Sequence, residues 1–124
     1  MAREAANVVV LDDEPDLREL MCALLEDEGY HVISLGHPRE AEDLENKEPE
    51  PDLFVLDLML PEMTGIQLAR VLRRDGFPHT PMIAMSASTG MLRAAKESQL
   101  FEESLPKPFE LSMLLDKVER LVRT

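Results

Sequence analysis

The sequence predicts an α/β fold with a doubly wound parallel sheet. Short apolar runs alternate with amphipathic, helix-like segments along the 124 residues, and alternating strands and helices of this kind form parallel sheets. Several apolar runs also end at a polar residue. Because the carboxyl ends of parallel strands lie along one edge of the sheet, where open α/β folds place their ligand crevice, we expect these polar residues to form one site.

Each expected strand is a short run of mostly apolar residues. The strands are Asn7–Leu11, His31–Leu35, Leu53–Leu56, Pro81–Met85 and Phe101–Leu105. Continuous apolar runs of this length are typical of buried strands. The fifth run is more polar, and the Pro106 that follows it cannot donate a backbone hydrogen bond, so it suits an edge strand or a strand end.

Helical spacing of apolar residues separates these strands. The helices are expected from Pro15 to Gly29, over Pro38–Asn46, from Ile66 to Gly76, over Gly90–Ser98 and over Leu111–Val122. Pro15 suits the first turn of a helix, and the two glycines suit helix ends. The second helix has little apolar content and is followed by an acidic, proline-containing turn over Lys47–Pro51.

Polar residues of complementary chemistry follow four of the strands. Asp12 and Asp13 come after the first strand, Asp57 after the third, Ser86 after the fourth and Lys107 after the fifth. Three crowded carboxylates repel one another, so such a site either keeps some of them protonated or holds a cation. Mg²⁺ prefers hard oxygen ligands of this type, with Mn²⁺ as an alternative. The remaining groups suit phosphoryl transfer to a carboxylate nucleophile, with the lysine and the hydroxyl stabilising the phosphoryl oxygens.

Taken singly, these residues have ordinary explanations. An isolated aspartate pair is usually a helix N-cap or a solvated turn, and a serine or lysine in a loop is usually a surface residue. Their joint spacing carries the prediction. The dispersed histidines His31, His37 and His79 have no paired ligand, and we assign them no metal or catalytic role.

Composition limits the classes of function. A net charge of −12 makes direct nucleic-acid binding by this chain improbable, because such a surface repels phosphate backbones. The polar amino terminus lacks the apolar core of a signal peptide and no apolar stretch approaches a membrane span, so we expect a cytoplasmic protein. The single cysteine, Cys22, is expected to be a buried apolar side chain. We expect one domain over residues 1–124, with no output domain.

The motifs resemble the CheY-like receiver domain of two-component response regulators over almost the whole chain. The resemblance rests on four blocks in the expected order and spacing: Leu11-Asp12-Asp13-Glu14-Pro15, Asp57-Leu58-Met59-Leu60-Pro61-Glu62-Met63-Thr64-Gly65, Met85-Ser86-Ala87 and Lys107-Pro108-Phe109. It implies a flavodoxin-like sheet of strand order 2-1-3-4-5 with helices on both faces. It also implies that Asp57 is phosphorylated by a sensor histidine kinase or a histidine phosphotransfer protein.

The same resemblance implies roles for the other site residues. Asp13 and Asp57 would bind Mg²⁺ directly together with the backbone carbonyl of Met59, and Asp12 would act through a bound water. Lys107 would pair with the acyl phosphate. Ser86 would hydrogen-bond a phosphoryl oxygen and move toward it on activation. The bond from Lys107 to the following proline would be cis.

The resemblance further implies a switch that loses its phosphoryl group slowly by hydrolysis. Its output face would be the fourth helix, fifth strand and fifth helix, which would bind a partner or form a phosphorylation-dependent homodimer. Ser104 stands where the family usually has a switch aromatic, which keeps open a phosphorylation-independent docking or dimerisation module. A phosphotransferase or phosphatase acting on an external substrate is disfavoured by the short length and by Met59, where haloacid-dehalogenase-like phosphatases have a second acidic residue. A single-domain regulator and a fragment of a longer protein both remain open.

Overall fold

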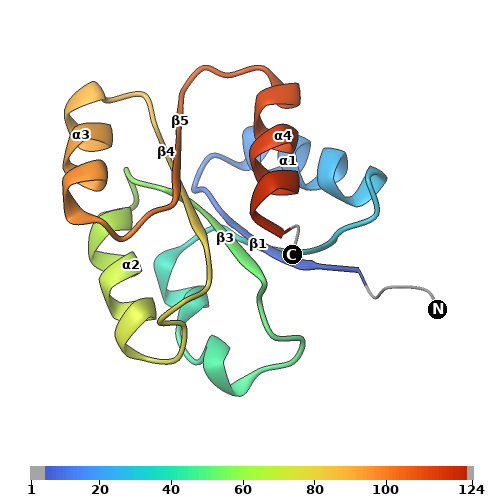
Figure 1. The fold of residues 1–124 in the computed structure, drawn as a ribbon, viewed down its shortest axis with the longest axis horizontal. Helices are drawn as coiled ribbons and strands as arrows, with labels where there is room; N and C mark the ends of the chain where they lie inside the picture. The colour runs from blue at the N-terminus through green and yellow to red at the C-terminus, as the bar shows by residue number, and fades with distance from the viewer. Residues whose placement is uncertain (1–4, 123–124) are drawn as a thin grey trace.

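The structure, a computed structural model, describes residues 5–122. Five parallel strands form one sheet in the order β2-β1-β3-β4-β5 (Figure 1). The strands are β1 (Asn7–Leu11), β2 (His31–Leu35), β3 (Leu53–Asp57), β4 (Met82–Ser86) and β5 (Glu103–Pro106). Both the strand order and the parallel, doubly wound architecture agree with the sequence-based prediction.

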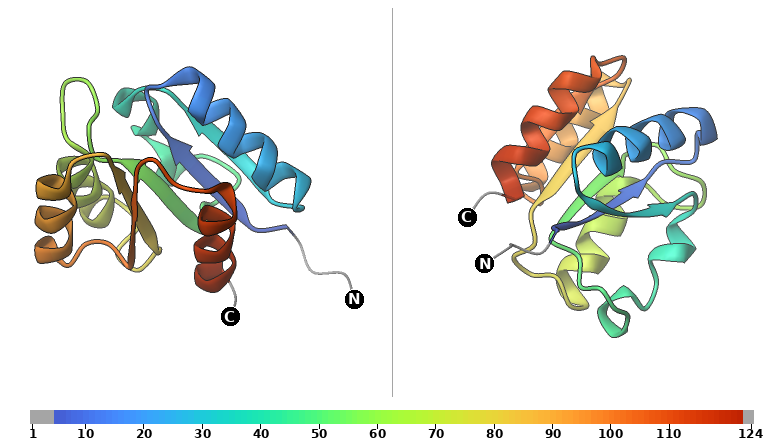
Figure 2. Two further views of the ribbon diagram at one scale, coloured as in Figure 1. Left: turned by 90° about the horizontal axis from the view of Figure 1, so that it is seen from above. Right: turned by 90° about the vertical axis from the view of Figure 1, so that its right-hand side faces the viewer.

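Helices cover both faces of this sheet, as the two views in Figure 2 show. They are α1 (Pro15–Asp27), α2 (Gly65–Arg74), α3 (Thr89–Ser98) and α4 (Leu111–Val122), together with the 3₁₀ turns η1 (Pro38–Ala41) and η2 (Leu44–Asn46). Apolar residues of α1 and α4 pack on one face, and those of η1, η2, α2 and α3 pack on the other. None of the helices within residues 5–122 is long and apolar enough to cross a membrane.

The central strands β3 and β4 are buried along their whole length, and β1 is buried beyond its first residue. Alternate residues of β1 enter different cores: Val8 and Val10 pack with α1 and α4, whereas Val9 and Leu11 pack with α2. A strand covered on both faces needs apolar residues at every position. This explains why the runs that predict the strands are continuous rather than alternating.

The segment Pro38–Asn46, expected as one short helix, forms two separate 3₁₀ turns. The backbone is extended at Glu42 and left-handed at Asp43, with φ of 69°, so the helical path breaks between the turns. In this segment Pro38, Ala41 and Leu44 are buried. A helix is stabilised mainly by packing its apolar face, and so small a face does not sustain a full helix. Elsewhere the predicted boundaries differ by one or two residues, as at β5, which begins at Glu103.

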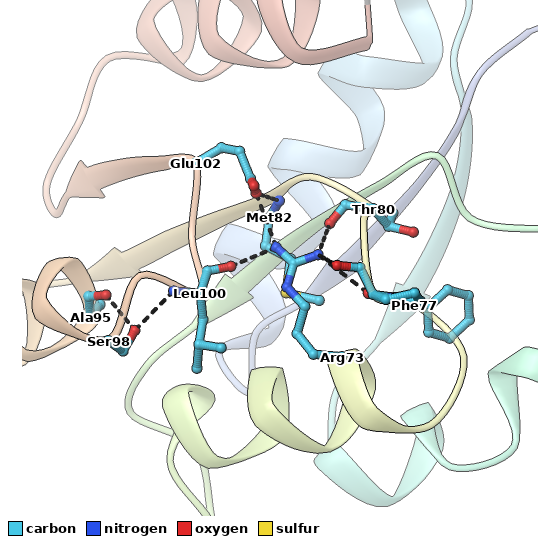
Figure 3. A network of polar contacts seen from close by, with 9 residues as sticks. Arg73, Phe77, Thr80, Met82, Ala95, Ser98, Leu100 and Glu102 are labelled. Atoms are coloured by element: carbon cyan, nitrogen blue, oxygen red, sulfur yellow. Dashed lines mark hydrogen bonds and ion pairs between the residues drawn. The ribbon is translucent and has the colours of Figure 1, made fainter.

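Arg73 forms a network of hydrogen bonds at the end of the sheet opposite the carboxyl termini of the strands (Figure 3). Its guanidinium donates to the carbonyls of Phe77, Pro78, Thr80 and Leu100 and to a carboxylate oxygen of Glu102. The same Glu102 oxygen accepts the Met82 N–H at 2.7 Å. One side chain therefore joins the end of α2 to the starts of β4 and β5. Nothing in the local sequence pattern indicates this long-range contact.

Candidate functional site

The strand register brings the predicted polar residues to one edge of the sheet. Asp12 directly follows the last residue of β1, and Asp57 and Ser86 are the last residues of β3 and β4. Asp57 lies beside Met85 in the neighbouring strand, and Lys107 directly follows β5. The site therefore forms where the carboxyl ends of parallel strands converge.

Three carboxylates meet at this edge. Asp12, Asp13 and Asp57 each offer an oxygen, and these oxygens all lie within 4.8 Å of one another. Asp12 and Asp57 are buried, whereas Asp13 is exposed. The predicted acidic cluster is thus present, with one member open to solvent. Oxygen donors in this arrangement fit a hard divalent cation such as Mg²⁺, which keeps several of its own waters.

Lys107 bridges two of these carboxylates. Its Nζ lies 2.8 Å from Oδ2 of Asp12 and 3.1 Å from Oδ2 of Asp57. The side chain is only 15% exposed, and its backbone N–H donates to the Ser86 carbonyl at 2.9 Å. The peptide bond to Pro108 is cis, as predicted. One ammonium therefore neutralises part of the buried acidic charge.

The surroundings of Asp57 make it harder to ionise. Burial raises the pKa of its carboxyl, and the charge of Asp12 adds to this rise; the N–H of Met59, which donates to Oδ1 at 2.9 Å, and Lys107 oppose it. Burial lowers the pKa of Lys107, but its bonds to Asp12 and Asp57 outweigh this effect and the net direction is upward. The lysine is therefore held in its charged form beside an aspartate whose charge is costly.

Asp12 also accepts hydrogen bonds from two later residues that the sequence pattern did not identify. Its Oδ1 accepts the N–H of Glu14 at 2.9 Å, and its carbonyl accepts Nη1 of Arg18 at 2.6 Å. The first contact is a local turn in which an aspartate accepts a backbone N–H two residues on. No local sequence signal predicts the Arg18 contact, because Arg18 reaches the Asp12 carbonyl only when α1 packs beside β1.

Ser86 is fully buried and connects the site to α3. Its Oγ accepts the N–H of Ser88 at 3.0 Å, and Oγ of Ser88 accepts the N–H of Met91 at 3.1 Å. Ser88 is the N-cap of α3, and serine directly before a helix is a recognised N-cap signal. The Ser88 contact could therefore have been predicted from the sequence, although it was not.

The loop after Asp57 packs tightly against the strand that it leaves. The N–H of Gly65 donates to the Leu58 carbonyl at 2.9 Å, and Thr64 and Gln67 form a capping box at the start of α2. A Cβ at Gly65 would lie 2.4 Å from the Asp57 carbonyl oxygen. Only glycine allows this close approach. Gly65 therefore helps to fix the backbone of Asp57.

Comparison with known protein families agrees with this geometry. Residues 8–119 match the model of the response regulator receiver domain. The chain belongs to this family. Receiver-domain relatives include the DNA-binding response regulator MtrA of Mycolicibacterium smegmatis, 34% identical over 94% of this chain and 50% of the relative. The phosphate regulon regulatory protein PhoB of Escherichia coli is 30% identical over 96% of this chain and 52% of its own length. The chain thus spans about half the length of the curated relatives it matches.

Solved receiver domains have the same fold. TrrA of Thermotoga maritima, in complex with Mg²⁺-BeF, superposes with a TM-score of 0.81 at 28% identity, covering 94% of this chain and 98% of TrrA. The non-phosphorylated HemR receiver domain of Leptospira biflexa gives 0.84 at 29% identity, covering 96% and 95%. The acidic pocket of Asp12, Asp13 and Asp57 matches the phosphorylation site of such receiver domains.

Two features of this receiver domain bear on its use of the pocket. Met59 is 56% exposed beside the pocket, and its carbonyl stays a predicted metal ligand. Ser104, which we predicted to stand at the family's switch-aromatic position, is an exposed residue of β5 beside Ala84. The predicted carboxylates and lysine thus lie together in the pocket, whereas position 104 carries a small polar side chain.

Proposed function

We propose that Asp57 is the phosphoacceptor of this receiver domain and takes a phosphoryl group from a sensor histidine kinase or a histidine phosphotransfer protein. The observation that carries the proposal is the joint placement of Asp57 with Asp12, Asp13 and Lys107 at the carboxyl edge of the sheet. The sheet thereby presents a nucleophile, a set of metal ligands and a cation together.

In the proposed reaction a carboxylate oxygen of Asp57 attacks the phosphorus of the donor. The bond from phosphorus to the donor imidazole nitrogen breaks, its electron pair returns to the imidazole, and an acyl phosphate forms on Asp57. When bound, Mg²⁺ would supply positive charge to the phosphoryl oxygens. Asp13, Asp57 and the Met59 carbonyl would hold the ion directly, Asp12 would hold it through a water, and Mn²⁺ would be an alternative ion.

Lys107 and Ser86 would respond to the new phosphoryl group. The ammonium that lies between Asp12 and Asp57 can pair with a phosphoryl oxygen. The Ser86 hydroxyl, now accepting from Ser88, can donate to another phosphoryl oxygen by rotating and moving toward it. Because Ser88 caps α3, this rearrangement would shift the equilibrium between two existing conformations of the face formed by α3, β5 and α4.

The wider setting follows from the same proposal. Residues 1–124 would act as a single cytoplasmic receiver domain whose chemistry is limited to its own phosphorylation and dephosphorylation. Its α3–β5–α4 face would bind a partner or a second copy. The net charge of −12 argues against direct contact with nucleic acid by this chain, although relatives such as MtrA are named as DNA-binding.

The test is the intact mass of the protein after incubation with Mg²⁺ and acetyl phosphate. We expect one phosphoryl adduct that requires Mg²⁺ and is absent from Asp57→Asn. Asp75→Asn is the matched control, because Asp75 is exposed, lies away from the pocket and is paired with Arg74; it should be phosphorylated like the native protein. An adduct that persists in Asp57→Asn would place the phosphoacceptor elsewhere.

Ser104 favours a second function, that of a docking or dimerisation module that works without phosphorylation. Its small side chain cannot act as the aromatic switch of the family. This alternative predicts no adduct on a folded protein, and a partner affinity that is the same for the native protein and for Asp57→Asn.

A further inference from the structure

The loop between β3 and α2, residues 58–64, is fixed at both ends by backbone hydrogen bonds. At its start Leu58 donates to the Met85 carbonyl at 2.8 Å, and at its end Gly65 donates back to the Leu58 carbonyl at 2.9 Å. Between these points, Met63 donates to the Pro61 carbonyl at 2.8 Å, which closes a turn within the loop itself. The position of Met59 is therefore set by the fixed Leu58, by its own bond to Asp57 and by the contacts of the loop residues that follow it.

Packing fills the space beside the middle of this loop incompletely. A cavity of about 170 Å³ lies between η1 and α2, and its lining includes Arg39, Glu62, Met63 and Leu72. Close packing is what usually prevents a loop from moving. Leu60 and Met63 of the loop pack against the core, and polar contacts reach from the loop to η1 beside this cavity.

Glu62 supplies these polar contacts. Its Oε2 lies 3.0 Å from Nε2 of His37, and its Oε1 lies 3.2 Å from Nη2 of Arg39. His37 Nδ1 accepts the backbone N–H of Arg39 at 3.0 Å, so the neutral ring carries its proton on Nε2, directed at Glu62. Both carboxylate oxygens are thus used, and the His37 ring is already oriented by its role as the N-cap of η1.

The backbone of Glu62 is unusual for a residue with a side chain. Its φ is 70°, in the left-handed region that glycine and asparagine adopt far more readily than glutamate. In this conformation the carboxylate lies against His37 and Arg39. A glutamate at a position that disfavours it, with both oxygens bonded to one neighbouring element, indicates a specific use of the side chain.

We propose that Glu62 is a positioning residue for phosphorylation. It holds the loop against η1 so that the Met59 N–H, which bonds Oδ1 of Asp57, and the Met59 carbonyl keep their places in the pocket. This inference rests on the proposed phosphorylation of Asp57. It also gives His37, to which the sequence pattern assigned no role, a part in shaping the site.

Four variants distinguish an effect of the Glu62 carboxylate contact from an effect of the Glu62 backbone conformation. Glu62→Ala removes the contact. Glu62→Gly also removes the contact, but glycine adopts the left-handed backbone without strain. If backbone strain rather than the lost contact caused the defect, Glu62→Gly would therefore behave better than Glu62→Ala. Glu62→Gln keeps one acceptor oxygen but places an amide NH₂ against the second donor, so it should lie between the native protein and Glu62→Ala. His37→Asn keeps an N-cap acceptor for η1 but is too short to reach Glu62.

The first measurement is the Mg²⁺ dependence of phosphorylation by acetyl phosphate. Because Glu62 is 52% exposed and its partners are accessible, we expect Glu62→Ala, Glu62→Gly and His37→Asn to raise the half-saturating Mg²⁺ concentration by about twofold to fivefold. Glu62→Gln should raise this concentration less than Glu62→Ala does, because it keeps one of the two contacts. Glu42→Ala, which removes a carboxylate lining the same cavity, is the matched control for charge and should behave as native.

The second measurement is amide hydrogen exchange in the metal-free protein. Glu62→Ala and His37→Asn should speed exchange at Met59 and Met63 while the thermal midpoint changes little. Native Mg²⁺ dependence and native exchange in both variants would overturn the proposal, and so would a lowered thermal midpoint with unchanged Mg²⁺ dependence. Failure of the native protein to accept a phosphoryl group on Asp57 would instead overturn the proposed function. The measurement on the native protein shows this before any variant is compared.

Discussion

Nζ of Lys107 lies 3.1 Å from Oδ2 of Asp57, although the two residues are 50 positions apart in the chain. The same ammonium lies 2.8 Å from the buried Asp12. The lysine side chain thus occupies the place where a phosphoryl group on Asp57 would need positive charge. Before phosphorylation it has a different effect, since it offsets the repulsion between two buried carboxylates.

Replacing Lys107 with methionine should destabilise the metal-free protein by about 3 kcal/mol, because two buried carboxylates lose their shared cation. Added Mg²⁺ should recover part of this loss by supplying charge to the same oxygens. Urea unfolding with and without Mg²⁺ measures both effects. Lys117→Met is the matched control: Lys117 is 18% exposed, close to the 15% of Lys107, but its partner Glu103 is more accessible. It should cost under about 1 kcal/mol, and an equal loss in both variants would contradict the prediction.

The raised pKa of Asp57 predicts how stability varies with pH. A carboxyl whose folded pKa exceeds its unfolded value contributes stability below the unfolded value, and this contribution is lost as pH rises through the folded pKa. Asp57→Asn abolishes the titration. Without Mg²⁺, the variant should therefore gain stability relative to the native protein as pH rises from 3.8, the ordinary aspartate value, through the raised folded value. Paired urea unfolding series across this range measure the difference, and a constant difference would refute the prediction.

Gly65→Ala should impair both folding and phosphorylation, since its Cβ would lie 2.4 Å from the Asp57 carbonyl oxygen and 2.8 Å from the Leu58 Cα. Backbone atoms cannot rotate away, so we expect a loss of about 1–3 kcal/mol. Phosphorylation by acetyl phosphate should also slow. Gly90→Ala is the control, because the nearest atom to its Cβ beyond the adjacent residues and the helix backbone is Oγ of Ser88 at 3.8 Å, and alanine favours α3 by up to about 1 kcal/mol. Thermal unfolding and adduct formation in both variants test this contrast.

Arg73→Ala should destabilise the protein by about 2–4 kcal/mol, because its carbonyl partners and Glu102 lose a charged donor in a largely buried position. The side chain is only 15% exposed. The neighbouring Arg74 is 71% exposed and bonds Asp75, so Arg74→Ala should change stability by less than about 0.5 kcal/mol. Chemical denaturation of the two variants compares them directly. Similar small losses in both would mean that the Arg73 network contributes little.

Much of the site could be recognised from local pattern alone. Continuous apolar runs place the strands, and a parallel sheet brings their carboxyl ends to one edge. Asp12, Asp57 and Ser86 were therefore predicted to meet, and the structure brings them together. The physical reason is that burial on both faces of a strand demands apolar residues at every position, so the polar residue that ends each run stands out.

Other features depended on contacts between distant segments. The sequence showed a lysine near the fifth strand but not its bridge between Asp12 and Asp57. It showed helix formers over Pro38–Asn46 but not the break between η1 and η2.

The Glu62 contact with His37 is of the same kind, because it joins two loops whose separation in space no spacing rule encodes. Periodicity reports which face of an element is buried, whereas side-chain partners are chosen only when the elements pack. Local sequence therefore determined which residues the pocket contains, whereas the tertiary structure determined which side chains contact one another there.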